Sequence, residues 1–153
     1  MALTRMLARP LLASSFVASG VDVLRNPEAK QADAEPVASQ VAESLGLPDD
    51  TVTLIKINGA VQVGAGLLLA TGRLPRLAAA ALAVSLVPTT LARHRFWEAD
   101  DPDARAGQQV HFLKNLSVLG GLILAAADTE GNPSLAWRAR HAVERAQEAL
   151  PFD

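Results

Sequence analysis

The chain contains no cysteine, and among its 153 residues it has only two methionines and three histidines. Without cysteine it can form no disulfide, no cysteine-ligated iron–sulfur cluster and no thiolate nucleophile. Haem needs axial ligands such as His, Met or Cys within a packed site. Both methionines, Met1 and Met6, lie at the N-terminus, and no histidine lies in the middle of an apolar run. We therefore expect no intrinsic cofactor and no metal site.

An excess of basic charge is also missing, because 16 acidic residues outnumber 14 basic ones. A formal net charge of −2 offers no basic surface for a phosphate backbone, so nucleic acid is not an expected partner. Aromatic residues make up only 4% of a chain that is 50% hydrophobic. Aqueous cores usually depend on large side chains, whereas membrane helices pack closely through small ones. This composition favours a membrane bundle.

Charged residues are absent from long stretches of the chain, and this segregation is its most informative feature. A helix on the surface of a soluble protein shows a polar stripe, but residues 77–87 and 118–127 show none. Each uncharged run is a little shorter than the roughly 20 residues that cross a hydrocarbon core, and flanking interfacial residues supply the difference. We therefore predict membrane spans at about residues 4–24, 53–72, 74–93 and 109–128.

The segments outside the spans are polar. Residues 25–51 are rich in acid, and the apolar residues from Pro36 to Leu45 have helical spacing that ends at Gly46. We expect a short amphipathic helix there, lying across the mouth of the bundle. A polar helix is predicted from Ser134 to Leu150. The predicted fold is all-α: a four-helix transmembrane bundle with a short amphipathic helix in the first loop (residues 1–130), followed by a C-terminal helical tail (residues 131–153).

Two alternatives to this fold are open. The chain could be a soluble all-α protein with buried Ala/Leu helices, although a domain this small cannot easily hide four all-apolar helices. The first run also resembles a signal peptide, with Arg5 and Arg9 before an apolar segment and the small residues 18–20 after it. We expect this helix to be retained, because its removal would leave three spans.

The orientation in the membrane is predicted from the short segments beside the spans. Arg5, Arg9, Arg73 and Arg76 flank spans without acidic neighbours, whereas the opposite side carries both acidic loops. Basic residues close to spans tend to remain in the cytoplasm. We therefore expect a multi-pass protein with both termini on the cytoplasmic side.

Small residues four apart occur in every predicted span, where they would let a neighbouring helix approach closely. An alanine-rich chain produces this spacing by chance. Glycine inside a helix costs about 1 kcal/mol relative to alanine and therefore needs a packing reason. The helix-contact positions that we predict are Gly64, Gly66, Gly120 and Gly121.

Two amides, Asn58 and Gln62, lie four residues apart within the second predicted span and so share one helix face. Unpaired amides are costly inside a bilayer, so we expect both to face the bundle interior. Ser85, Thr89 and Asn115 are the expected hydrogen-bond partners. This interpretation makes the amides structural rather than a binding site.

Polar and aromatic residues gather at one predicted membrane face, between the third and fourth spans. His111, Lys114 and Asn115 lie at i, i+3 and i+4 on one helix face. One interpretation is a belt at the depth of the lipid headgroups. The other is a quinone site, which needs an apolar slot and one or two hydrogen-bonding groups. The residues of this interfacial group are His94, Arg95, Trp97, His111, Lys114 and Asn115.

Three segments resemble a known family. They are Arg9-Pro10 with Phe16 and Gly20; the Gly-rich and Ala-rich stretch from Gln62 to Ala79; and residues 111–122, which contain Lys114-Asn115-Leu116 and Gly120-Gly121. Together they are similar to the DoxX family of small bacterial membrane proteins. Two residues depart from the family pattern: Gln62 stands where many members have Glu, and the segment after Gly20 lacks a lysine often found there. The resemblance therefore does not carry a proton-linked or ion-paired role onto these positions.

The resemblance implies a bacterial plasma (inner) membrane location and a redox context. Family members resemble subunits of quinone-linked oxidoreductases, or scaffolds in an oxidative-stress assembly with superoxide dismutase and a thiosulfate sulfurtransferase. We therefore expect an integral membrane subunit or scaffold of such an assembly, without its own cofactor and not catalytic alone. The expected partners are the lipid bilayer and other subunits or a second copy. The alternatives are a quinone-reactive oxidoreductase subunit and a small-molecule or lipid carrier.

Overall fold

The computed structural model describes residues 2–46 and 50–129, together with Gly131, Trp137, His141 and Arg145. Most of the predicted tail helix, residues 134–150, lies outside the described residues. The described part contains helices and no strands, which confirms the all-α prediction. The elements are α1 (Ala2–Arg25), η1 (Glu28–Lys30), α2 (Gln31–Leu45), α3 (Thr51–Ala70), α4 (Pro75–Arg93), η2 (Phe96–Glu98) and α5 (Pro102–Ala127).

Four of these helices, α1, α3, α4 and α5, are long and apolar enough to cross a membrane, as predicted. The largest difference is at α5, which begins at Pro102 and not near residue 109. Asp101 caps it by accepting a hydrogen bond from the Ala104 amide at 2.8 Å, and proline suits a first helical position. Its 26 residues extend about 39 Å, so its first turns protrude beyond a hydrocarbon core of about 30 Å.

The turn between α3 and α4 is built around Gly72, which has a φ of 70°. The Gly72 amide donates to the Leu69 carbonyl and the Arg73 amide donates to the Leu68 carbonyl, at 3.1 and 2.9 Å. This pair of bonds satisfies the last carbonyls of a helix that ends in a left-handed residue. The chain then reverses within a few residues, and α4 packs beside α3.

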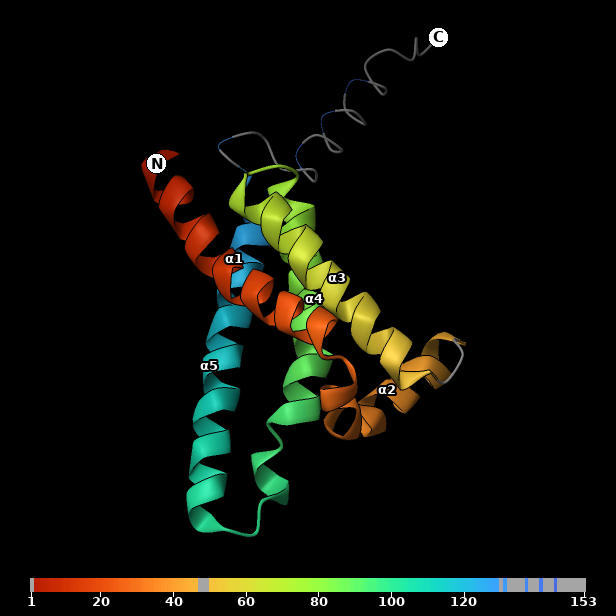
Figure 1. Cartoon of the computed structure of the whole chain (residues 1–153). Coiled ribbons are helices and arrows are strands. Elements are labelled where there is room, and N and C mark those ends of the chain that lie inside the picture. Colours follow the sequence, from red (N-terminus) through yellow and green to blue (C-terminus); the bar gives the residue numbers. More distant parts are fainter. Residues whose placement is uncertain are drawn as a thin grey trace, which may run out of the picture.

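The helices pack in a chain of neighbours, α1 on α3, α3 on α4 and α4 on α5, while α1 touches α5 only lightly. Figure 1 shows α1 and α3 side by side, and α5 standing to one side of α4. The core contains Ala13 and Phe16 from α1, Leu69 from α3, Leu82 from α4 and Leu122 from α5. Between α1 and α3, a Cβ added to Gly20 would lie 2.7 Å from the Gly59 carbonyl oxygen. The two backbones therefore meet almost directly.

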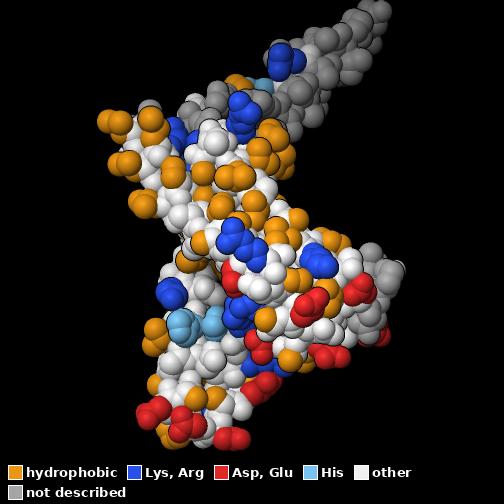
Figure 2. Space-filling model, viewed as in Figure 1, with side chains coloured by type: hydrophobic (Ala, Val, Ile, Leu, Met, Phe, Trp, Pro, Cys, Tyr) orange, Lys and Arg blue, Asp and Glu red, His pale blue; other side chains and the backbone are white. Residues whose placement is uncertain are grey.

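The start of α1 and the end of α5 are joined by charged side chains. Arg5 donates from Nε and Nη2 to both carboxylate oxygens of Asp128, at 2.6 and 2.8 Å, and Arg9 lies 3.7 Å from the same carboxylate. Arg76, at the start of α4, donates to the Ala126 carbonyl at 2.9 Å. These helix ends therefore lie at one end of the bundle. Figure 2 shows acidic side chains gathered at the other end, over α2 and the start of α5.

The predicted amphipathic helix in the first loop is confirmed as α2. Its buried residues, Val37, Ala38 and Ala42, face α3 and α4, whereas Asp33 and Glu43 are exposed. α2 begins at Gln31, before Pro36, and ends at Leu45, which is followed by Gly46 with a φ of 63°. A left-handed glycine after the last helical residue is a common helix stop. α2 thus covers the ends of the spans on the side away from Arg5 and Asp128.

Candidate functional site

A cavity of about 590 Å³ lies between the C-terminal part of α1, α2, α3 and α4. This volume is within the range of pockets that hold small molecules. Its walls are mostly aliphatic side chains, among them Val23, Val37 and Leu54. Along α4 the lining residues extend from Ala80 to Arg93, which corresponds to about 20 Å of helix. The cavity is therefore an elongated apolar slot.

Four polar side chains line the cavity between α3 and α4. Asn58 and Gln62 are one turn apart on α3, and Ser85 and Thr89 are one turn apart on α4. Ser85 Oγ donates to Asn58 Oδ1 at 2.8 Å, and Asn58 Nδ2 donates to Thr89 Oγ1 at 3.0 Å. Thr89 Oγ1 in turn donates to the Ser85 carbonyl at 2.9 Å. These bonds form a closed ring around Asn58, and Ser85 and Thr89 are two of the partners that the sequence had suggested.

Gln62 is only partly satisfied by this ring. Its Nε2 lies 3.4 Å from Thr89 Oγ1, at the long end of hydrogen bonding. Its Oε1 has no hydrogen-bond partner among the described residues, although the side chain is only 2% exposed. A buried acceptor left without a donor costs about 1–3 kcal/mol. Gln62, one of the residues that line the cavity, therefore carries one acceptor that the described residues leave unpaired.

Pro88 lies on the cavity wall, within α4. Because proline has no amide hydrogen, it cannot donate to the carbonyl of Val84. Hydroxyl groups of Thr89 and Thr90 donate to the carbonyls of Ser85 and Leu86, each four residues back. Both hydroxyls therefore bond to carbonyls next to the one that Pro88 leaves without its helical donor.

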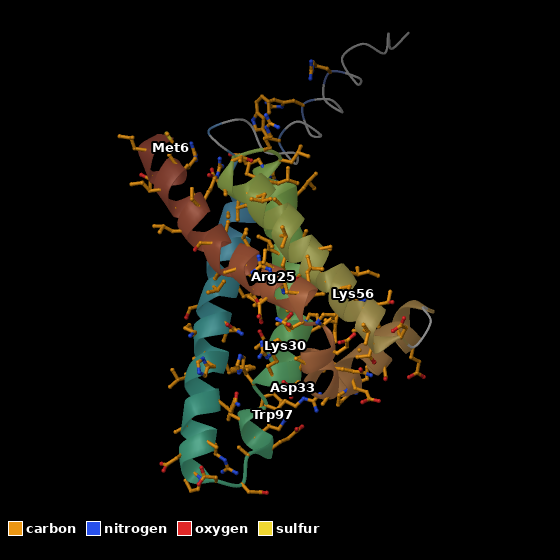
Figure 3. The ribbon with its side chains drawn as sticks, viewed as in Figure 1. Met6, Arg25, Lys30, Asp33, Lys56 and Trp97 are labelled. Carbon is orange, nitrogen blue, oxygen red and sulfur yellow. The ribbon has the colours of Figure 1, made fainter. Side chains whose placement is uncertain are left out.

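Charged residues stand at one end of the cavity. Lys30 and Asp33, from η1 and α2, and Arg93, from the end of α4, all line it. Lys30 also forms an ion pair with Asp22 of α1 at 3.1 Å. Figure 3 shows Lys30 and Asp33 in front of α4, with Trp97 farther along the chain at η2. The slot thus begins at a charged rim and continues into an apolar interior.

The structure brings part of the predicted interfacial group together, but away from this cavity. The rings of His94 and His111 stack with centroids 5.2 Å apart, and His94 Nδ1 lies 2.7 Å from Gln108 Oε1. Asn115 Nδ2 donates to Thr90 Oγ1 at 3.1 Å. These contacts join α4 to α5. None of these residues lines the 590 Å³ cavity, which lies against α3.

The other members of the interfacial group have different surroundings. Arg95 donates to the Leu91 carbonyl at 2.7 Å and contacts Glu98 at 3.3 Å. Trp97 packs edge-on against Phe96 and Phe112, and the Lys114 side chain is exposed. Arg95 and Trp97 are thus engaged within their own segment and with Phe112. Whether this group binds quinone remains a prediction.

The predicted glycine contacts fall into two classes. A Cβ on Gly66 would lie 2.7 Å from Val17 Cγ2, and one on Gly121 would lie 3.5 Å from Leu12 Cδ1, so both positions face α1. A Cβ on Gly64 or Gly120 would meet no atom of the described chain within 4 Å. The closest approach of backbone to backbone involves Gly20 and Gly59, which were not among the predicted contact positions.

The model of the DoxX family matches residues 4–95. This chain belongs to the DoxX family. The match includes α1 to α4, and therefore every element that lines the cavity. It ends before α5, so His111, Lys114 and Asn115 lie beyond it. No curated protein and no solved structure matches the chain.

Proposed function

We propose that this DoxX protein is a membrane-embedded binding subunit that holds an apolar small molecule in the cavity between α1, α2, α3 and α4. The observation that carries the proposal is the combination of a 590 Å³ apolar slot with an unpaired, buried Gln62 Oε1. Small-molecule sites are mostly apolar, with a few polar groups that fix the orientation of the ligand. A purely structural bundle would gain stability by filling the slot or by replacing Gln62.

The side chains at the edge of the slot indicate where the ligand comes from. Ile57, Val61 and Val84 line it and are also 54%, 36% and 73% exposed. These residues lie within candidate membrane spans, so their exposed surfaces face lipid. A molecule dissolved in the bilayer can therefore enter sideways. Quinones, isoprenoids and acyl lipids belong to this class.

A quinone or quinol is the ligand that would connect this cavity with a redox assembly. Under this proposal the chain holds the molecule for a partner subunit that supplies the redox chemistry. Arg5, Arg9, Arg73 and Arg76 belong to the end of the bundle where α1 begins and α5 ends, which supports a cytoplasmic location for both termini in a bacterial inner membrane.

A matched pair of tryptophan variants tests the binding site. Ala80 lines the cavity and Ala60 does not, and both side chains are exposed on membrane helices. We expect Ala80→Trp to fill the slot and Ala60→Trp to face lipid. In native mass spectrometry, wild type and Ala60→Trp should retain a small molecule that Ala80→Trp loses. The same pair should differ in stabilisation by a decyl-substituted benzoquinone and its hydroquinone. No bound molecule and no stabilisation in any of the three proteins would refute the proposal.

The role as a subunit has a separate test. The tagged protein, purified from bacterial membranes in mild detergent, should bring a redox enzyme subunit with it in defined stoichiometry. Recovery of the chain with lipid alone would contradict the assembly while leaving the binding site intact.

A further inference from the structure

We propose that the cavity holds one acyl chain of a phospholipid whose head group carries both a phosphate and an ammonium, and that this head group binds at the charged rim. The inference rests on the proposed function, because it names one class among the bilayer molecules that the cavity would hold. Three observations carry it: the length of the slot, its open side, and two unpaired charges of opposite sign at the rim.

The length of the slot matches one leaflet of a bilayer. The lining residues of α4, from Ala80 to Arg93, correspond to about 20 Å of helix. Half of a hydrocarbon core of about 30 Å is about 15 Å. Arg93 is the last residue of α4, at the end of the bundle that α2 covers. The slot therefore extends from the depth of the head groups to about the middle of the membrane, as an acyl chain does.

The slot also has a side that is open to the bilayer. Ile57, Val61 and Val84 line it and are exposed on membrane helices. An aliphatic chain can therefore lie in the slot while the rest of the same lipid stays in the surrounding leaflet. Each methylene that the aliphatic walls enclose contributes to binding.

Two charges at the rim lack a partner in the described part of the chain. Asp33 of α2 and Arg93 of α4 line the same cavity, yet neither forms a hydrogen bond or an ion pair with a described residue. Lys30 lies one turn before Asp33 (Figure 3) but pairs with Asp22 of α1 at 3.1 Å. The charge of Asp22 also attracts Arg93, without direct contact. The rim therefore offers one cation and one anion to a ligand.

A head group with both charges complements this rim better than a head group with one charge or none. Its phosphate accepts hydrogen bonds from the Arg93 guanidinium, and its ammonium donates to the Asp33 carboxylate. It can bridge two side chains that do not pair with each other. A lipid with a phosphate alone would bring a negative charge close to Asp33. An uncharged quinone would leave both side chains unpaired.

The experiment compares two lipids with the same acyl chains, phosphatidylethanolamine and phosphatidylglycerol. Both have a phosphate, and only the first has an ammonium. Each is titrated into the full-length protein in a nonionic detergent, and bound lipid is counted by native mass spectrometry. We expect phosphatidylethanolamine to bind wild type about threefold to fivefold more tightly, which is the effect of one exposed ion pair.

A matched pair of variants locates this preference at Asp33. Asp33→Asn removes the negative charge and keeps the shape of the side chain, so the two lipids should bind alike. Glu35→Gln removes a charge from an exposed position of the same helix that does not line the cavity, and it should keep the wild-type preference. A preference that survives in Asp33→Asn would overturn the inference.

A second pair tests the phosphate. Arg93→Gln should weaken both lipids by a similar factor, because both have a phosphate, and the preference between them should remain. Lys56→Gln removes a positive charge from an exposed position of α3 outside the cavity and should change neither lipid. Equal weakening by both substitutions would show a general attraction to the basic surface and would overturn the assignment of Arg93.

The slot variant separates this inference from the proposed function. Ala80→Trp should reduce binding of both lipids, because it fills the space of the acyl chain. Equal binding of the two lipids by wild type, reduced in Ala80→Trp, would overturn the head-group inference and leave the binding site standing. Stabilisation by the benzoquinone with no binding of either lipid would have the same meaning. Lipid binding that Ala80→Trp does not reduce would place the chain elsewhere and overturn the inference. No bound molecule and no stabilisation of any kind would refute both.

Discussion

Adjacent threonines on α4 serve two different interfaces. Thr90 faces α5: its oxygen accepts from Asn115 of α5, and its hydroxyl donates to the Leu86 carbonyl within α4. Thr89 faces α3, where its oxygen serves the ring with Asn58 and the long contact with Gln62. On the α5 side Thr90 and Asn115 pair with each other, and neither lines the 590 Å³ cavity. On the α3 side an open slot and an unpaired acceptor remain. Paired polar groups stabilise helix packing, whereas an unpaired group beside open volume indicates a ligand.

The largest expected effect comes from separating the helices that form the slot. Gly20→Ala would place a Cβ 2.7 Å from the Gly59 carbonyl oxygen, and backbone at that distance must move. We expect a loss of about 2 kcal/mol or more in stability, together with loss of ligand binding, because α1 and α3 both line the slot. The midpoint of thermal unfolding in detergent measures the loss.

Gly64→Ala is the matched control for this change, because a Cβ there meets no described atom within 4 Å. Alanine is also the better helix former by about 1 kcal/mol, so this variant should be as stable as wild type or more stable. Equal destabilisation by both substitutions would contradict the close contact of α1 with α3.

The second prediction compares two amides that bond to α4 from opposite sides, Asn58 from α3 and Asn115 from α5. Asn58→Leu removes the partner of the Ser85 hydroxyl and a donor to Thr89, so it should cost about 2 kcal/mol. Asn115→Leu removes one donor to Thr90, which keeps its bond to Leu86, and should cost about 1 kcal/mol or less. Unfolding midpoints of the two variants, measured in the same detergent, decide between them. A larger loss for Asn115→Leu would reverse the contrast drawn here.

A third substitution should raise the stability of the ligand-free protein. Gln62→Met replaces a buried unpaired oxygen with an apolar group of similar size, so the ligand-free protein should gain about 1 kcal/mol. Thermal unfolding after ligand removal by detergent exchange measures the gain. A loss of stability would show that the contact between Gln62 Nε2 and Thr89 outweighs the unpaired oxygen.

The smallest effect concerns pH and the cap of α3, the helix that carries both cavity amides. The Thr53 hydroxyl, at 2.6 Å, and the Thr53 amide, at 3.1 Å, donate to the Asp50 carboxylate and lower its pKa below the usual 3.8. A lowered native pKa means that this contribution is complete above about pH 4 and is lost as the pH falls further. Asp50→Ala should therefore weaken α3 at pH 7 and matter less at pH 3. An equal effect at both values would contradict the capping role.

The sequence predicts the four spans and α2 because their hydrophobic patterns are local. The predicted span at about 109–128 leaves out the first turns of α5, because these turns are polar; the capping signal of Asp101 and Pro102 marks the true start of the helix. The cavity could not be predicted in this way. It arises where α2 docks beside α1, α3 and α4, and no local pattern specifies that placement.

The glycines show a different limit on what residue spacing can predict about helix contacts. Residues two apart on a helix point about 200° apart, so Gly64 and Gly66 cannot both face the same neighbour. Spacing alone could therefore have excluded one of them, and the structure places Gly66 against α1. Gly20 and Gly59 gain their role only because α1 packs closely on α3, and spacing within one helix cannot reveal a contact between two helices.

The contact between Arg5 and Asp128 has a consequence for how the protein inserts and folds in the membrane during its synthesis. The two residues are separated by 123 positions, and α1 is synthesised long before α5. During translation α1 can therefore pack on α3 while its carboxylate partner is still inside the ribosome. The ion pair closes only when the last span has been inserted, so a chain cut short before Asp128 is released without it. The complete and the truncated bundle therefore differ in the Arg5–Asp128 ion pair, which lies where the first and last spans meet.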